Sequence, residues 1–222
     1  MMKRSADTGR FEPRWPVALT ILVLLFVLAA LPDRIRLYPS WLAYALGIAV
    51  LTPLAGVGLT SARLWWRRVE RVVVLVFVVV VAAMIVINLA NVTVLMLSRS
   101  AHTSGIQLLT SSIALWVTNV FTFSLLYWQI DRGGPEGRIE GGSGRADWLF
   151  PQVGAPPGEV PRGWYPSFVD YLYLSYSTAT AFSSTEVAPL TIRAKLMMML
   201  QSMISLATIV LVASRAINIL GS

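Results

Sequence analysis

The sequence predicts an all-α integral membrane protein with five transmembrane helices and a re-entrant pore helix and loop before the last one. Of its 222 residues, 56% are hydrophobic and only 13% are charged, whereas typical soluble chains carry about 25% charged residues. The mean hydropathy is +0.67. The apolar residues also come in runs close to the ~20 residues that a helix needs to cross a bilayer. Together these observations exclude a soluble globular protein.

Five apolar runs define the expected transmembrane helices. The first follows a basic tail at 1–16 and resembles the apolar part of a signal peptide. Because this tail is long and contains acidic residues and prolines, we expect the run to be retained as a helix. The first three helices are interpreted as accessory helices within 17–104. The expected helices are 17–31, 41–59, 72–97, 105–128 and 190–220.

A polar section at 129–166 separates the fourth and fifth helices. Its first half is rich in Gly and charged residues and has little to bury, so we expect a flexible loop. Its second half contains the aromatic segments 148–150 and 164–165. Aromatic side chains of this kind prefer the membrane interface, so we expect this half to fold back onto the headgroup layer.

Residues 167–182 form an apolar segment that is too short to cross the bilayer and ends in small hydroxylated residues. Irregular backbone at membrane depth is tolerated only where it is buried in protein or lines a watery cavity. The segment therefore predicts a re-entrant helix and a filter-like loop at 167–189, enclosed by an oligomer.

Residues 175–191, Ser-Tyr-Ser-Thr-Ala-Thr-Ala-Phe-Ser-Ser-Thr-Glu-Val-Ala-Pro-Leu-Thr, can be aligned without gaps to the pattern S-F-x-T-x-T-T-V-G-Y-G-D-x-x-P-x-T. On these residues the chain resembles the potassium-channel-like pore-loop superfamily. The resemblance implies a pore-like module at 105–222, with an outer helix at 105–128 and an inner helix at 190–220. The residues that agree with the pattern are Ser175, Thr178, Thr180, Pro189 and Thr191.

The centre of the motif departs from the family, because Phe-Ser-Ser-Thr replaces V-G-Y-G. Glycines let a potassium filter turn successive carbonyls inward, and a residue with a Cβ pays roughly 1–2 kcal/mol for a left-handed backbone. Potassium selectivity of the usual kind is therefore not expected, and side-chain hydroxyls are the candidate oxygen ligands. The predicted filter-like residues are Thr180, Ala181, Phe182, Ser183, Ser184, Thr185 and Glu186.

Two of these motif residues have alternative interpretations. Glu186 is either an ion-attracting carboxylate, a buried partner of Arg193 or Lys195, or a solvated loop residue. Thr191 could simply cap the fifth helix. Gln201, Ser205 and Thr208 recur on one face of that helix and are weaker candidates for lining a pore.

The fourth helix also resembles a poorly characterised bacterial family of multi-span proteins, through Trp116-Val-Thr-Asn119 and the stretch from Tyr127 to Pro135. This resemblance implies a multi-pass protein of the bacterial inner (plasma) membrane. The expected partners are the lipid bilayer and three further copies in a homotetramer. Nucleic acid is not expected as a partner, because the net charge of +7 comes from Lys and Arg gathered at helix ends.

The distribution of Lys and Arg favours an N-terminus in the cytoplasm. With four helices before it, the pore loop would then enter from the cytoplasmic side, opposite to potassium channels. Either the pore is inverted or the number of spans differs by one.

We therefore expect a channel-like protein that passes monovalent cations with low selectivity, and no cofactor beyond a bound monovalent cation. A non-conducting membrane scaffold or partner-binding subunit with a pore-loop fold is the alternative. An enzyme is not expected, because the chain has no cysteine, one histidine and no paired carboxylates within a helix.

Overall fold

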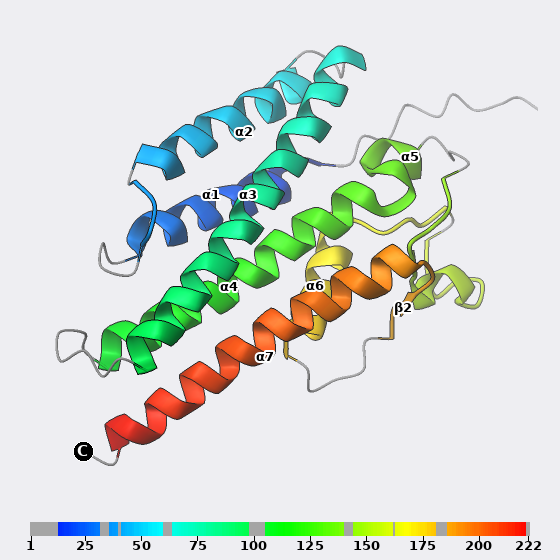
Figure 1. The fold of residues 1–222 in the computed structure, drawn as a ribbon. Coiled ribbons are helices and arrows are strands. Elements are labelled where there is room, and N and C mark those ends of the chain that lie inside the picture. Colours follow the sequence, from blue (N-terminus) through cyan, green and yellow to red (C-terminus); the bar gives the residue numbers. More distant parts are fainter. Residues whose placement is uncertain are drawn as a thin grey trace, which may run out of the picture.

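The protein was analysed as a computed structural model, which describes residues 13–31, 36–39, 41–59, 64–97, 105–139, 144–161, 163–180 and 186–220. The described part is dominated by helices, as the sequence predicts (Figure 1). The elements are α1 (Trp15–Ala30), α2 (Trp41–Leu59), α3 (Leu64–Leu97), α4 (Gly105–Ile130), η1 (Asp131–Gly133), α5 (Pro135–Ile139), β1 (Trp148–Leu149), η2 (Pro151–Gly154), α6 (Phe168–Thr180), β2 (Ala188–Pro189) and α7 (Ile192–Leu220).

Each of the five expected apolar runs coincides with a helix. Within the described part of the chain, three helices are long and apolar enough to cross a membrane, by length and composition. The apolar stretches of α1 and α2 are shorter. The stretches long enough to span are Trp65–Val94, Leu109–Gly133 and Ile192–Ser214.

The largest difference from the expected boundaries is at the start of α3, which begins at Leu64 rather than at residue 72. Its 34 residues make it about 50 Å long, well beyond a ~30 Å hydrocarbon core. Its first two turns carry Trp, Arg and Glu residues, and Arg and Glu are good helix formers. The helix therefore continues past the apolar run at this end.

Helix α4 is the centre of the molecule. It packs against α1, α3, α6 and α7, and α2 packs against α1 and α3. Figure 1 shows the long helices α3, α4 and α7 side by side, with the short α6 against α4 and α7. The side chains of Phe123, Leu125, Tyr127 and Trp128, near the C-terminal end of α4, are fully buried in the core.

A tight turn follows α4 and redirects the chain into the polar section. Arg132, Gly133 and Gly134 all have positive φ, and the Gly134 N–H donates to the Asp131 carbonyl at 2.8 Å. A Cβ on Gly134 would lie 3.1 Å from the Gln129 carbonyl oxygen. Glycine therefore meets both the conformational and the steric requirement at this position.

In the described part of the polar section, Trp148 and Phe150 are buried in protein, whereas the sequence suggested the membrane interface for this aromatic segment. Trp148 packs against Tyr127 and Tyr171, and Phe150 packs against Tyr171 and Trp164. Strands β1 and β2 pair antiparallel, with Trp148 opposite Pro189 and Leu149 opposite Ala188. This pairing ties the polar section to the residues just before α7.

Candidate functional site

The candidate site is the unit formed by α4, α6 and α7, which contains the motif of residues 175–191. Helix α6 runs antiparallel to α4. Its first residue, Phe168, packs on the ring of Trp128 near the end of α4. Further along, the Ser175 hydroxyl donates to the Val120 carbonyl at 2.6 Å. Near its last turn, the Ala179 carbonyl accepts from the Trp116 indole at 3.4 Å.

Helix α6 is short and ends beside the middle of its neighbours. It has 13 residues and is about 20 Å long. Its last turn lies beside Ser205, midway along α7, because the Ser205 hydroxyl donates to the Ala179 carbonyl.

The next described residues, 186–190, are back at the end of the bundle from which α6 starts. Ala188 and Pro189 pair with β1, and the Leu190 N–H donates to the Asp147 carbonyl at 2.7 Å. The chain therefore goes into the bundle along α6 and comes back to the same end (Figure 1).

A buried hydrogen-bond cluster around Gln201 joins the three helices. The Gln201 amide of α7 donates to the carbonyl and hydroxyl of Ser175 at 2.9 and 2.7 Å. The Gln201 Oε1 accepts from the Tyr127 hydroxyl at 2.6 Å. Asn119 of α4 donates to the Gln201 carbonyl at 3.3 Å. All four side chains are fully buried, where polar groups are stabilising only when they are paired.

A second buried cluster closes the end of the bundle where α6 begins, around Asp147. The Asp147 carboxylate accepts two bonds from the Arg193 guanidinium, at 2.6 and 2.5 Å, and one from the Thr191 hydroxyl at 2.6 Å. Thr191 also accepts from the Ala194 N–H at 3.2 Å, so it caps α7 as one interpretation expected. Such a bidentate arginine–carboxylate pair is geometrically specific.

Asp131 connects this cluster to α6. One of its carboxylate oxygens accepts the Asp147 N–H at 2.7 Å, and the other accepts the Tyr171 hydroxyl at 2.6 Å. The Arg138 guanidinium lies 4.9 Å from the centre of the Tyr171 ring and donates to the Trp128 carbonyl at 2.7 Å. The end of α4, the start of α6 and the start of α7 are therefore fixed together by buried charged groups.

Of the filter-like residues, the structure describes only the first, Thr180, and the last, Glu186. Thr180 ends α6, and its hydroxyl donates to the Ser177 carbonyl at 3.0 Å. Glu186 is exposed, and Arg193 pairs with Asp147. The interpretation of Glu186 as a buried partner of Arg193 or Lys195 is therefore wrong. Outside the described residues lie Ala181, Phe182, Ser183, Ser184 and Thr185.

Thr180 also lines an apolar cavity of about 280 Å³ between α4, α6 and α7. The cavity lies beside the last turn of α6, where the partial negative charge of a helix C-terminus is located. The other lining residues are Ile113, Trp116, Thr208, Ile209 and Val212.

The three residues expected to line a pore share one buried face of α7, directed at α4 and α6 within the same chain. Gln201 and Ser205 bond to α6, and the Thr208 hydroxyl donates to the Ile204 carbonyl of its own helix. Their contacts in one chain are structural, and a pore-lining role stays a prediction. Between residues 196 and 214, where the structure describes the side chains of α7, the exposed residues are apolar and include Met199, Leu200, Met203, Leu206 and Val210.

Asp131, Asp147 and Tyr171 were not among the candidate residues. The signal available in the sequence was a pair of carboxylates in the polar section and an arginine in the first turn of a transmembrane helix. Within the described residues, no three His, Cys, Asp or Glu side chains are placed to hold a metal ion.

Comparisons with protein-family models, curated proteins and solved structures find no match to this chain. The assignment of a function therefore depends on the geometry of α4, α6 and α7.

Proposed function

We propose that this chain is a multi-pass membrane protein in which α1, α2, α3, α4 and α7 cross the bilayer and α6 is re-entrant. The alternation of helix directions supports this arrangement. Because the helices alternate in direction, α1, α3 and α7 all start at the end of the bundle where α4 finishes. At this end Arg14, just before α1, contacts Trp128 of α4 and pairs with Glu70 of α3. Arg14, Arg67, Arg138 and Arg193 then lie at one end, which the positive-inside rule assigns to the cytoplasm.

The function supported best is passage of monovalent cations through a homotetramer of this chain. The observation that carries it is α6, a half-length helix that ends midway along α4 and α7 and whose chain returns to its starting end. Four such helices would direct their C-terminal partial charges of about −0.5 each at a central axis and favour cations there. The loop after Thr180 would supply side-chain hydroxyls as ion ligands, with little selectivity between sodium and potassium.

Ion flux into liposomes containing the purified protein tests this function. We expect sodium and potassium flux from the tetramer, changed several-fold by Thr180→Val, which removes the hydroxyl at the edge of the filter-like loop. The matched control is Thr110→Val, because Thr110 is exposed on α4 and its hydroxyl bonds only within its own helix. A verified tetramer without flux of either ion would rule out conduction.

The alternative is a non-conducting scaffold or partner-binding subunit that keeps the pore-loop fold. It is favoured by the apolar exposed face of α7 and by the use of Gln201 and Ser205 in packing within one chain. A Glu186→Ala variant separates the two functions. Altered conductance with unchanged assembly supports ion passage, and altered assembly without any conductance supports the scaffold.

A further inference from the structure

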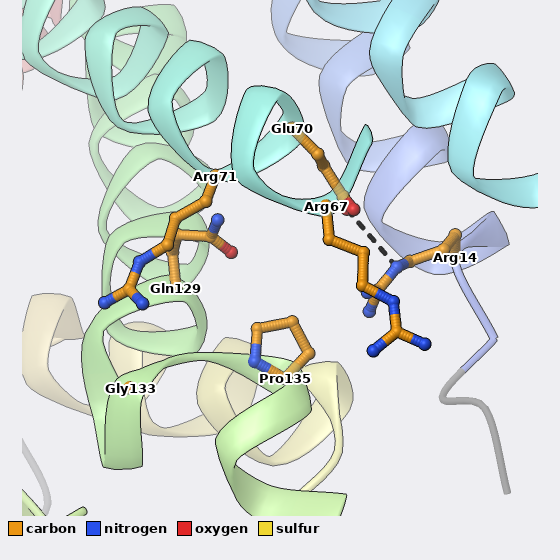
Figure 2. A pocket seen from close by; sticks show the side chains of 7 residues that line it. All are labelled: Arg14, Arg67, Glu70, Arg71, Gln129, Gly133 and Pro135. Atoms are coloured by element: carbon orange, nitrogen blue, oxygen red, sulfur yellow. Dashed lines mark ion pairs between the residues drawn. The ribbon is translucent and has the colours of Figure 1, made fainter. Parts of the chain in front are cut away.

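A small cavity lies at the arginine-rich end of the bundle, away from the contact between α6 and α7. Its volume is about 30 Å³, enough for one or two water-sized groups. Figure 2 shows the lining residues of α3, α4 and α5 and the residue before α1, with the guanidinium groups of Arg14 and Arg67 on one side of Pro135 and that of Arg71 on the other. The lining residues are Arg14, Arg67, Glu70, Arg71, Gln129, Gly133 and Pro135.

The lining carries more positive than negative charge. Glu70 is buried, and its carboxylate lies 3.2 Å from the Nε atom of Arg14. Arg67 and Arg71 add two further guanidinium groups on opposite sides of Pro135 (Figure 2). Among the lining residues, Glu70 is the single carboxylate that faces these three arginines.

Two lining side chains also carry buried polar atoms without a hydrogen-bond partner. They are the Nη1 atom of Arg14 and the Oε1 atom of Gln129. Gln129 is only 2% exposed. Arg14 is held in place by its ion pair and by the Trp128 ring, whose centre is 5.2 Å from the guanidinium carbon. Buried polar atoms normally have a partner. An anionic oxygen satisfies the guanidinium N–H of Arg14 best, whereas the Gln129 oxygen is itself an acceptor and needs a donor such as water.

The start of α1 adds to the attraction for an anion. Arg14 is the N-cap of α1 and makes no side-chain capping bond. The positive end of the helix dipole therefore lies at this end, although Pro16 in the first turn has no N–H to donate. Trp15 and Trp65, the first residue of α1 and the second of α3, are strongly exposed. Exposed tryptophans at the ends of apolar helices are typical of the headgroup level of a membrane.

We propose that this cavity and its open mouth bind the phosphate group of an anionic phospholipid headgroup, with one or two of the phosphate oxygens entering the cavity. Arg14 and Arg67 would donate to the phosphate oxygens, and the exposed Arg71 side chain would turn toward them from the other side of Pro135. The Gln129 oxygen would accept from a water held beside the phosphate. The proposal requires only that the bundle lies in a membrane, so it can succeed or fail independently of ion passage.

The test measures binding to the purified full-length protein in detergent, by native mass spectrometry and thermal unfolding, with three ligands in parallel. These are phosphatidylglycerol, phosphatidylcholine and inorganic phosphate. The variants are Arg67→Gln and Arg71→Gln, and the matched control is Arg68→Gln, which changes the same charge on an exposed side chain of α3 outside the cavity. Because Arg71 is itself exposed, its variant tests the site even where Arg67→Gln lowers the yield of folded protein.

We expect phosphatidylglycerol to bind and stabilise the protein more than phosphatidylcholine. Binding should weaken about ten-fold in Arg67→Gln and Arg71→Gln, the loss expected for one charge-assisted hydrogen bond, and should be unchanged in Arg68→Gln. Inorganic phosphate with the same dependence on the variants would support the phosphate site and identify a soluble source. Equal weakening in Arg68→Gln, or no preference for phosphatidylglycerol over phosphatidylcholine, would overturn the proposal.

Discussion

Gln201 is predicted to hold α6 between α4 and α7, so its replacement should loosen this unit. In Gln201→Met the side chain keeps its length, but Ser175 loses two bonds and the buried Tyr127 hydroxyl loses its acceptor. Hydrogen bonds between membrane helices contribute about 0.6 kcal/mol on average and up to about 1.7. A buried hydroxyl left without a partner costs about 1–3 kcal/mol. We therefore expect the free energy of unfolding to fall by about 2–4 kcal/mol.

The assay is reversible unfolding in mixed detergent micelles of Gln201→Met, Tyr127→Phe and the double variant. Because Tyr127→Phe removes the hydroxyl that Gln201→Met leaves unpaired, the double variant should lose at least ~1 kcal/mol less than the sum of the single losses. Strictly additive losses would refute the proposed contact. A change in ion flux without any change in stability would instead favour the prediction that Gln201 lines a pore.

Three further predictions concern the end of the bundle and the connection between α1 and α2. Asp147→Ala should lower the unfolding free energy by about 2–3 kcal/mol, because the Thr191 hydroxyl and the Arg193 guanidinium at the start of α7 lose their acceptor. The Arg193 side chain is 59% exposed, so its lost ion pair adds little to this value. Glu159→Ala, an exposed carboxylate of the same polar section, is the control, and equal losses would contradict the prediction. Gly134→Ala should cost at least ~1–2 kcal/mol, since φ is +96° there, whereas Gly154→Ala, with open space around it, should be close to neutral; the same thermal-unfolding assay compares them. Burial raises the pKa of Tyr38 to about 12, so its contribution to stability should be complete below pH ~10 and should be lost as the pH approaches 12. Ultraviolet titration of wild type and Tyr38→Phe measures this: the two curves should coincide up to about pH 11 and differ by one tyrosine around pH 12. A one-tyrosine difference already centred near pH ~10 would contradict the prediction.

The positions of the helices could be predicted from the sequence because the apolar runs and the polar sections alternate clearly. The run at 72–97 marks only the apolar part of α3, however. Hydropathy cannot show that the helix extends back to Leu64, because Arg and Glu are compatible with both a helix and a loop.

The polar face of α7 could also be predicted, because Gln201, Ser205 and Thr208 recur at helical spacing. Periodicity identifies a shared face but not what that face contacts. A watery pore and the backbone of a neighbouring helix both suit amide and hydroxyl groups, and within one chain the contacts are with α4 and α6.

The buried cluster around Asp131 and Asp147 was not predicted, because it depends on contacts between residues far apart in the chain. In the sequence, Asp131 and Asp147 have the pattern of solvated loop carboxylates. In the structure they are buried, together with Trp148 and Tyr171. An aromatic segment beside a membrane helix equally suits the membrane interface and a protein core. Only the tertiary packing distinguishes these two environments.

The return of the chain after α6 to its starting end is the feature on which the pore-loop proposal depends, and cysteine labelling tests it most directly. The chain has no cysteine, so Gln152→Cys before α6, Leu190→Cys after it and Leu37→Cys at the opposite end can each be labelled without background. All three positions are exposed. A membrane-impermeant thiol reagent should label positions 152 and 190 from the same side, the cytoplasmic one, and position 37 from the other. Labelling of positions 152 and 190 from opposite sides would mean that α6 crosses the membrane, which would contradict a re-entrant helix.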